Sequence, residues 1–491
     1  MQRSNAESEE GARALGHGGT INADICIIGA GSGGLSVAAS TVLLGMKVVL
    51  IEKHLMGGDC LNTGCVPSKA LIAAARRAHD MRTAGDFGIR SIEPEVDAGA
   101  VNDHIKSVIA SIARNDSVER FTGMGVEVIQ APARFRDKHT VEAGDTLVKA
   151  WRFVIATGSS PAVPAIPGLD KVSYLTNESL FDLRQSIGHL VVIGGGSVGM
   201  EMAQAYLRLG AKVTVLEGLK ALGRDDPELS DVVLKRLHAE GLTLREGVRV
   251  ERVGGWPGVV QVTIATPEGP EVVEGTHLLI AAGRKPNVED LNLEAAGIRH
   301  DHRGIMVSPG LVTSNRKVFA IGDVIAGGQQ FTHVANYHAG IVFRRALFRL
   351  PAKVQSELIP WVTFTKPELA QVGLTEDQAR QQHGPIQVFR WPYHENDRAQ
   401  TERATEGFVK VVTDRKGRIL GAGIVGREAG ELIQIWSLAI SQGLKITAMT
   451  QWIAPYPTLG EINKRAAMGT YALSASKPLV RKVVGLLRKL G

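Results

Sequence analysis

The stretch DICIIGAGSGGLSVAASTVLLGMKVVLIE, residues 24 to 52, decides the fold. It contains an apolar strand, a turn with Gly29, Gly31 and Gly34, an apolar helical stretch, and a second strand that ends in Glu52. Glycines in such a turn let the backbone approach a pyrophosphate at a helix N-terminus, and the terminal acid can bind a ribose hydroxyl. The stretch therefore predicts a Rossmann-like dinucleotide-binding domain.

The same pattern recurs later as HLVVIGGGSVGMEMAQAYLRLGAKVTVLE, residues 189 to 217. Its turn contains Gly194, Gly196 and Gly199, and its second strand ends in Glu217. Two such units in one chain predict two dinucleotide sites. Because an ordinary dehydrogenase needs only one, the second site favours a flavoprotein that passes electrons between a nicotinamide and FAD.

Further short strands that run into glycine turns indicate that one nucleotide domain is inserted into the other. These strand ends carry Thr157, Gly158, Gly283, Gly322 and Asp323, and Asp323 is an acid that could hold a hydroxyl of a sugar chain. After about residue 355 the strands and helices lack a nucleotide turn. This change of pattern predicts an α+β domain with its own core.

The bulk composition excludes several classes of protein. The formal charge of +6 comes from 56 basic and 50 acidic residues, and only 5% of the residues are aromatic, so we expect no nucleic-acid partner. The N-terminal 20 residues are polar and include acids, unlike a secretory signal. The most apolar stretch, residues 35–51, is interrupted by Gly45 and Lys47, unlike a membrane span. We therefore expect a cytoplasmic protein.

Three cysteines are too few for a disulfide framework, and Cys26 lies in an apolar run that predicts a buried strand. Cys60 and Cys65 lie in GGDCLNTGCVPSK, residues 57 to 69. Their sulfurs are within reach of a disulfide if this segment opens a helix, and a helix N-terminus lowers a thiol pKa. A zinc site is the alternative, but no further cysteine or histidine cluster completes four ligands, so we expect no metal.

With both glycine turns and this cysteine motif in order, residues 22 to 471 resemble the pyridine nucleotide-disulfide oxidoreductases, which include dihydrolipoamide dehydrogenase, glutathione reductase and mercuric reductase. The resemblance implies a homodimeric enzyme with FAD, NADH or NADPH, and a redox-active disulfide. It implies that Cys65 is the sulfur nearest the flavin and that Cys60 is the interchange thiol that meets the acceptor. Lys69 matches the lysine beside the flavin, and Glu201 matches the carboxylate that pairs with it.

The fold class expected from these observations is α/β, with two nested Rossmann-like FAD- and NAD(P)-binding domains plus a C-terminal α+β dimerisation domain. The expected boundaries are 1–21 for a disordered tail, 22–160 and 287–354 for the two parts of the FAD domain, 161–286 for the NAD(P) domain, 355–471 for the dimerisation domain and 472–491 for a basic amphipathic tail.

Many further positions match cofactor-binding residues of the family. They are Gly29, Gly31, Gly34, Glu52, Lys53, Gly58, Lys69, Thr157, Gly158, Gly322, Asp323, His333, Ala335, Gly194, Gly196, Gly199, Glu217 and Gly283. The segment at 332–335 matches the helix start whose dipole stabilises reduced flavin. Glu217 would accept hydrogen bonds from a ribose diol and repel a 2′-phosphate, so we expect NADH over NADPH, although Arg224 lies close in the sequence.

One motif departs from the family pattern. Disulfide-reducing members carry His-Pro-Thr-x-x-Glu, whereas this chain has Tyr456 in place of the histidine and keeps Glu461. Tyrosine, with a reference pKa of about 10, stays protonated where histidine would exchange a proton. General acid-base help is worth about 10²–10⁴-fold, so we expect a small electrophilic acceptor or a low-pKa disulfide rather than lipoamide or glutathione disulfide.

Two roles for Tyr456 remain open: it donates to a bound substrate with Glu461 as an orienting acceptor, or it only fills an interface. Mercuric reductases also have a tyrosine there, but they carry a C-terminal cysteine pair, and this sequence has no cysteine after Cys65. The tyrosine that many members place in the second glycine turn is Ser197 here. The chain is therefore similar to mercuric reductase without an expectation of useful mercury turnover.

The tail at 479–490 repeats apolar residues at helical spacing with basic residues between them. It could make a weak contact with an acidic membrane surface, or it could pack in the dimer. Two alternative functions also remain. One is a membrane-peripheral NADH:quinone reductase, which needs no cysteines, and the other is a redox sensor whose flavin reports the NADH/NAD ratio.

Overall fold

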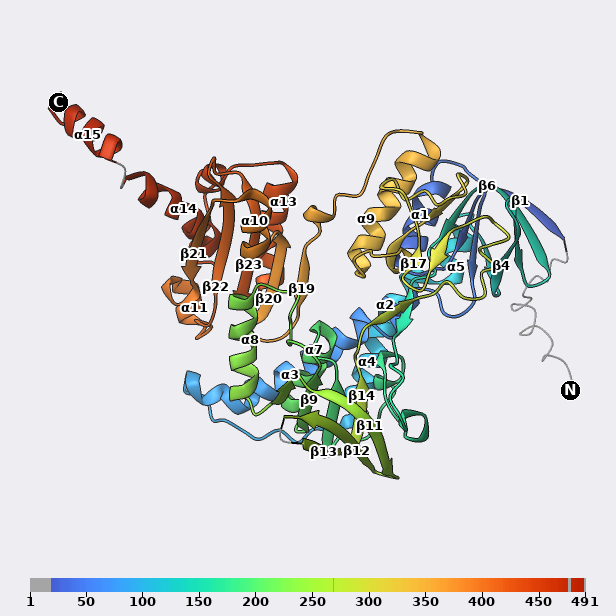
Figure 1. The fold of residues 1–491 in the computed structure, drawn as a ribbon, viewed down its shortest axis with the longest axis horizontal. Coiled ribbons are helices and arrows are strands. Elements are labelled where there is room, and N and C mark those ends of the chain that lie inside the picture. The colour runs from blue at the N-terminus through green and yellow to red at the C-terminus, as the bar shows by residue number, and fades with distance from the viewer. Residues whose placement is uncertain (1–18, 268, 476–477, 490–491) are drawn as a thin grey trace, which may run out of the picture. The chain divides into compact units, whose positions relative to one another are not determined.

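The computed structural model describes residues 19–267, 269–475 and 478–489 (Figure 1). The described residues form two compact units, the first within 1–65, 109–160 and 284–354 and the second within 66–108, 161–283 and 355–491. Residues 66–108 group with the second unit, and the expected domain boundaries stay a prediction. The expected tail at 1–21 lies outside the described residues up to residue 18.

The first unit is built on a mostly parallel sheet. Its strands are β1 (Thr20–Ile28), β2 (Val48–Glu52), β3 (Glu127–Gln130), β4 (Ala133–Asp137), β5 (Thr140–Ala143), β6 (Thr146–Ile155) and β18 (Val318–Ala320), and its helices include α1 (Ser32–Val42), α2 (Gly58–Asn62), α5 (Val118–Gly123) and α9 (Thr332–Val342). Strands β3, β2, β1, β6 and β18 pair in parallel in that order, as in doubly wound dinucleotide folds. The end of β1 at Ile25–Ile28 is fully apolar and buried, as expected for a strand covered on both faces.

The second unit repeats this plan and adds a separate sheet. Its nucleotide half contains β8 (His189–Ile193), β9 (Lys212–Glu217), β10 (Thr243–Glu246), β11 (Arg249–Trp256), β12 (Val259–Thr266), β13 (Gly269–Gly275), β14 (His277–Ile280), α7 (Ser197–Arg208) and α8 (Pro227–Ala239). Strands β10, β9, β8 and β14 form a parallel sheet, and β11, β12 and β13 form an antiparallel one. Helix α3 (Cys65–Thr83) crosses from the first unit into the second.

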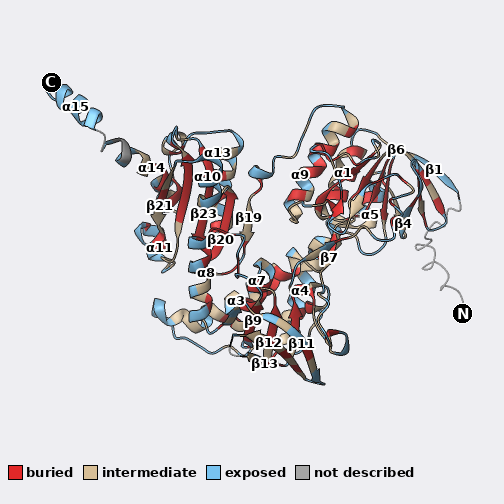
Figure 2. Cartoon of the chain, in the orientation of Figure 1, coloured by how far each residue is buried: buried red, intermediate tan, exposed pale blue. Residues whose placement is uncertain are grey.

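The C-terminal half of the second unit is an antiparallel sheet covered by helices. Its elements are β19 (Trp361–Thr363), β20 (Glu368–Gly373), α10 (Glu376–His383), β21 (Ile386–Pro392), α11 (Asp397–Thr401), β22 (Phe408–Asp414), β23 (Ile419–Gly426), α13 (Gln434–Ser441), α14 (Glu461–Ala475) and α15 (Pro478–Leu487). Its strands pair in the order β19, β20, β23, β22, β21. Figure 2 shows that buried residues follow the strands of each sheet. These layers confirm the expected α/β class with a separate C-terminal α+β part.

Of the helices in the described ranges, none is long and apolar enough to cross a membrane.

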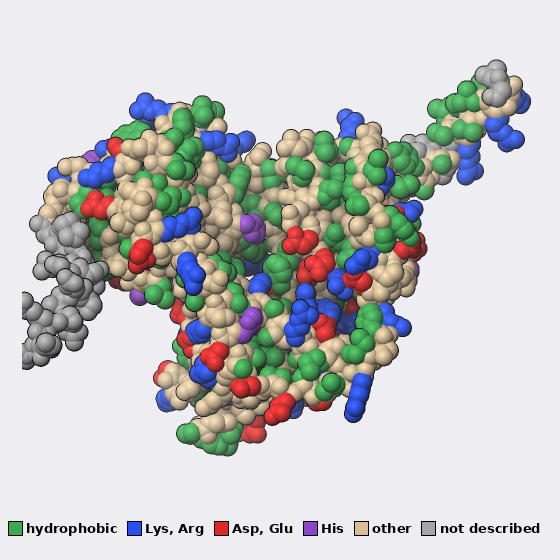
Figure 3. Space-filling model, turned by 180° about the vertical axis from the view of Figure 1, so that it is seen from behind, with side chains coloured by type: hydrophobic (Ala, Val, Ile, Leu, Met, Phe, Trp, Pro, Cys, Tyr) green, Lys and Arg blue, Asp and Glu red, His purple; other side chains and the backbone are tan. Residues whose placement is uncertain are grey.

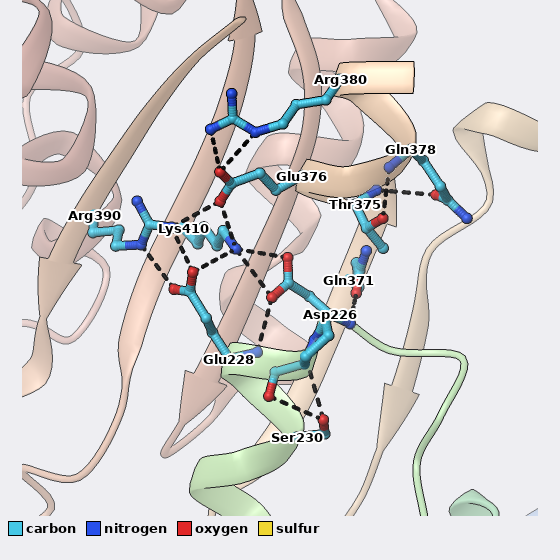
Figure 4. A network of polar contacts seen from close by, with 11 residues as sticks. Asp226, Glu228, Ser230, Gln371, Thr375, Glu376, Gln378, Arg380, Arg390 and Lys410 are labelled. Atoms are coloured by element: carbon cyan, nitrogen blue, oxygen red, sulfur yellow. Dashed lines mark hydrogen bonds and ion pairs between the residues drawn. The ribbon is translucent and has the colours of Figure 1, made fainter. Parts of the chain in front are cut away.

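A buried lysine joins the two halves of the second unit. Lys410 on β22 is 4% exposed, and its Nζ lies 2.8 Å from the Asp226 carboxylate, 2.9 Å from Glu376 and 3.2 Å from Glu228 (Figure 4). Asp226 also caps α8 by accepting a hydrogen bond from the backbone N–H of Glu228 at 3.1 Å. Burial alone would raise the pKa of Glu376, but hydrogen bonds from Lys410 and Arg380 outweigh it and lower that pKa to about 2.

We expect Lys410→Met to lower the free energy of unfolding of the second unit by about 3–5 kcal/mol, because it leaves the buried Asp226 carboxylate without its counter-charge and removes one of the cations beside Glu376. Glu376 has a lowered pKa in the folded state, so its contribution is complete above about pH 4.5 and is lost as the pH falls toward 2. The deficit of the variant should therefore shrink over this window. Denaturant unfolding at several pH values measures this difference in the free energy of unfolding. Lys416→Met, at an exposed lysine, is the control, and an equal loss of stability in the two variants would contradict the prediction.

Candidate active site

The two glycine turns have the same backbone geometry. Gly29 and Gly194 begin them with φ of 105° and 114°, a region that favours glycine. A Cβ added at Gly34 would lie 1.9 Å from the carbonyl oxygen of Gly29, and one at Gly199 would lie 2.0 Å from that of Gly194. At Gly196 an added Cβ would meet nothing within 4 Å, so the backbone there is open to a ligand. Tight turn, open middle position and close helix packing are what a bound pyrophosphate requires.

The acids at the ends of β2 and β9 are fixed in the same way. Glu52 accepts hydrogen bonds from the backbone N–H of Ala30 at 2.7 Å and from the residue two positions beyond itself at 2.8 Å. Glu217 does the same with Gly195 at 2.6 Å and with the second residue after it at 2.8 Å. A carboxylate has about four lone-pair sites, so each acid keeps acceptor capacity for a ribose hydroxyl. The residues present thus fit two dinucleotides, FAD and a nicotinamide.

Close backbone approach also explains two of the expected glycines beside the first turn. Gly58 has φ of 61°, and a Cβ there would lie 2.7 Å from the Cα of Gly31. Gly322 has φ of 69°, and its added Cβ would lie 3.2 Å from that of Ala335 on α9. All four expected positions, 31, 58, 322 and 335, lie in the first unit. The backbone at Gly58 packs directly against the backbone at Gly31, and Gly322 packs against the side chain of Ala335.

Asp323 lies in a polar cluster that sequence reasoning did not find. Its carboxylate accepts a hydrogen bond from Ser159 Oγ at 2.7 Å and lies 3.7 Å from the Arg284 guanidinium. Arg284 also pairs with Asp59 at 3.1 Å, next to the first cysteine of the motif. Burial raises the pKa of Asp323, and Ser159 and Arg284 oppose that rise. Arg284 therefore links the cysteine segment to the expected flavin-binding acid.

The remaining expected cofactor-binding residues differ in their contacts and exposure. Thr157 donates its hydroxyl to the carbonyl of Asn287 at 2.8 Å. His333 stacks on Phe331 with ring centroids 5.3 Å apart, and Lys53 is exposed. Gly158 and Gly283, at the strand ends, have φ of 67° and 120° with no neighbour near an added Cβ.

The two cysteines occupy consecutive helices rather than one. Cys60 lies in α2, whereas Cys65 is the first residue of α3, and no disulfide joins them in this structure. Cys65 Sγ lies 3.3 Å from the hydroxyl of Thr332, the first residue of α9. Two helices thus begin at this sulfur, and their positive ends favour a thiolate there. Cys26 is fully buried in β1, as predicted.

Cys60 and Cys65 are directly coupled by a hydrogen bond. That bond is the largest cause raising the pKa of Cys60; burial raises it further, and Thr332 lowers it. These effects favour the protonated form of Cys60. The separate roles of the two sulfurs stay a prediction.

Lys69 and Glu201 form the expected ion pair. Lys69 Nζ lies 2.7 Å from Glu201 Oε2, and the Glu201 side chain is only 5% exposed. Phe364 completes the arrangement: its backbone N–H donates to Glu201 Oε1 at 2.9 Å, and its ring lies 4.4 Å from Lys69 Nζ. Lys69 is four residues after Cys65 in the same helix, so the ion pair fixes the side chain one turn along from the sulfur.

Tyr456 hydrogen-bonds to an acid at the start of α11. Its hydroxyl donates to Asp397 Oδ2 at 2.9 Å, and this bond is the largest cause of a raised pKa for Tyr456. Glu461 instead pairs with Arg465 at 2.9 Å, one turn further along α14. The acceptor of the Tyr456 hydroxyl is therefore Asp397 rather than Glu461. The tyrosine side chain remains 71% exposed.

Comparison with known proteins gives a consistent result. The family of pyridine nucleotide-disulphide oxidoreductases matches residues 23–339, and the dimerisation domain of that family matches residues 359–467. Mercuric reductase of Lysinibacillus sphaericus is 36% identical over 91% of this chain and 82% of its own length. Dihydrolipoyl dehydrogenase of Bacillus subtilis is 34% identical over 91% of this chain and 96% of its own length.

Solved structures agree with these relatives. The HOCl-induced flavoprotein disulfide reductase RclA of Escherichia coli aligns with a TM-score of 0.81 at 28% identity, over 90% of this chain and 99% of that one. LpdA of Mycobacterium tuberculosis aligns with a TM-score of 0.84 at 26% identity, over 91% and 99%. The matched dimerisation domain supports a homodimer. The chain belongs to the pyridine nucleotide-disulfide oxidoreductases, flavoprotein enzymes that use FAD and NAD(P)H, in the group of mercuric reductase and dihydrolipoyl dehydrogenase.

Proposed function

We propose that this enzyme moves two electrons from NADH through FAD to a Cys60–Cys65 disulfide, and from the two thiols to a small electrophilic acceptor or a low-pKa disulfide. The observation that carries the proposal is the state of Tyr456, whose phenol donates to Asp397 while Glu461 pairs with Arg465. Neither side chain resembles a histidine base. The reaction must therefore suit an acceptor that needs little protonation as it leaves.

The cysteine pair supplies its own proton transfer for the first attack. Cys60 hydrogen-bonds to Cys65, so its proton can pass to the Cys65 thiolate as the Cys60 sulfur bonds to the acceptor. Re-formation of the disulfide then releases the two-electron-reduced acceptor and one proton. When bound, FAD would supply the two electrons that reopen the disulfide, and the Lys69–Glu201 ion pair would lie beside it. Such thiol chemistry suits the cytoplasm, where we place the enzyme.

The relatives support this class of acceptor. Mercuric reductases are named for a thiophilic metal ion, and RclA has been solved as a Cu(II) complex. The sequence has no cysteine after Cys65, so we propose that mercuric ion is not the physiological acceptor. A panel of mercuric ion, Cu(II), glutathione disulfide, lipoamide, an aromatic low-pKa disulfide and quinones, assayed with NADH, tests the proposal. Fastest turnover of lipoamide or glutathione disulfide would reject it.

Glu217 carries the proposed preference for NADH. We expect Glu217→Gln to lower the ratio of kcat/KM for NADH to that for NADPH by about tenfold, because it removes the charge that repels a 2′-phosphate while an amide oxygen can still accept from Gly195. Glu246→Gln is the matched control, since Glu246 also accepts from a backbone N–H, that of Ala221, but lies outside the turn. An equal ratio in both variants would contradict the assignment.

A further inference from the structure

The last helix exposes an apolar face. No residue from Pro478 to Lys489 is buried, and Figure 2 shows α15 as exposed along its length. Six aliphatic side chains share this exposure, with Leu479 the most exposed at 73%. They are Leu479, Val480, Val483, Val484, Leu486 and Leu487. A contiguous set of exposed aliphatic side chains on one helix indicates a surface that binds a protein or a membrane.

The apolar and basic side chains of this helix lie on separate faces. At about 100° per residue, the six aliphatic side chains fill an arc of roughly 160°, and the basic side chains lie in the remaining arc. The basic ones are Arg481, Lys482, Arg488 and Lys489. Figure 3 shows basic and hydrophobic side chains on different sides of this terminal segment.

The charge of the chain is concentrated in this region. Seven of the 56 basic residues and none of the 50 acidic ones follow Glu461. The rest of the chain therefore has one more acid than base, and the whole positive surplus belongs to the last 30 residues. An anionic surface would attract this end of the protein.

We propose that α15 is a docking surface for an anionic lipid bilayer, on which it lies with its aliphatic face between the headgroups and its basic face toward the lipid phosphates. A segregated helix with a purely basic polar face matches such a surface. A nucleic acid would satisfy the charges but would leave the aliphatic face in water. Two copies of α15 packed through their aliphatic faces would leave the basic faces outward, with no acid in the last 30 residues to pair with them.

The length of the helix fits lying on the bilayer rather than crossing it. Ten residues span about 15 Å, roughly half of a hydrocarbon core. One such helix binds weakly, because each basic residue near an anionic surface raises the affinity only about fivefold. A homodimer carries two copies, and simultaneous contact strengthens the binding without any new contact in the protein.

Cosedimentation of the full-length FAD-loaded enzyme with lipid vesicles tests the proposal. We expect the enzyme to pellet with vesicles of equal parts phosphatidylcholine and phosphatidylglycerol at low salt, and to stay in solution with pure phosphatidylcholine. Truncation after Ala475, or the pair Lys482→Glu and Lys489→Glu, should lower the bound fraction at least about tenfold. The pair Lys416→Glu and Lys445→Glu makes the same change of net charge at exposed sites outside the tail, and should leave binding intact.

The aliphatic face has its own matched test. Val483→Gln with Leu487→Gln should lower binding several-fold, whereas Gly485→Gln, on the basic face, should not. Equal binding of the truncated enzyme, or no binding of the full-length enzyme, overturns the proposal. Sedimentation velocity completes the test: if truncation converts the dimer to a monomer, the aliphatic face packs against the second copy and the proposal fails.

Discussion

Cys65→Ser is expected to abolish the long-wavelength absorbance that appears when the FAD-loaded enzyme takes up two electrons from NADH, and to lower turnover of every thiol-dependent acceptor by at least about a thousandfold. The band requires a thiolate beside the flavin. Cys65 hydrogen-bonds to Cys60 and lies at the start of α3 and near that of α9, so we expect the negative charge on this sulfur. A serine hydroxyl at that position stays protonated, so it cannot replace the thiolate that donates electron density to the flavin.

Cys60→Ser is the matched control and should behave in the opposite way. It leaves Cys65 unable to form the disulfide, so the absorbance should be present before any NADH is added, while turnover is again lost. Absorbance spectra with and without NADH under anaerobic conditions measure both effects. A band that survives Cys65→Ser and disappears with Cys60→Ser would show that the two sulfurs have exchanged roles.

Replacing both cysteines separates the proposed function from a quinone reductase. If Cys60→Ser with Cys65→Ser leaves NADH:quinone turnover unchanged, electrons reach quinones without the disulfide, and membrane docking by α15 would then serve that reaction. If the double variant loses turnover of quinones as well as of the other acceptors, electrons reach every acceptor through the disulfide.

The parts of this site that the sequence predicts are those encoded within one local segment. Gly29, Gly34 and Glu52 lie within a single strand-turn-helix-strand unit, so their spacing alone predicts the turn, the close helix packing and the fixed acid. The parallel pairing of β1 with β2 follows, because a strand-helix-strand unit of this length returns the second strand in the direction of the first. The spacing of the cysteines was less informative, since a break between α2 and α3 separates residues that one helix would have carried.

The residues that sequence reasoning missed depend on long-range contacts. Phe364 binds Glu201 through its backbone N–H, which any residue other than proline provides, so no side-chain pattern marks the position. Asp397 is the first residue of α11 and belongs to no motif, yet it accepts a hydrogen bond from the hydroxyl of Tyr456, which lies in the segment before α14. Arg284 gave a weak signal, since it directly follows a glycine turn, but its partners Asp59 and Asp323 come from distant segments.

Tyr456→His should raise kcat/KM for glutathione disulfide and lipoamide, by up to about 10²–10⁴-fold, because it restores a side chain that can protonate the leaving thiol. Asp397 lies within hydrogen-bonding reach of the tyrosine hydroxyl and would orient the imidazole and raise its pKa. The gain should therefore appear with a pH profile that falls as the histidine loses its proton. Tyr456→Phe, which keeps the ring without the hydroxyl, is the control and should show no gain.

The ion pair between Glu461 and Arg465 slightly limits how far Tyr456→His alone can raise kcat/KM. The pair joins residues four apart on α14, and the arginine side chain is 48% exposed, so the contact is worth only about a factor of two. A new histidine can take Glu461 from Arg465 at that small cost, and adding Arg465→Gln should improve Tyr456→His by no more than about twofold. If Tyr456→His gains no more than Tyr456→Phe even with Arg465→Gln, the missing base does not set the specificity, and the acceptor is chosen at the cysteine pair itself.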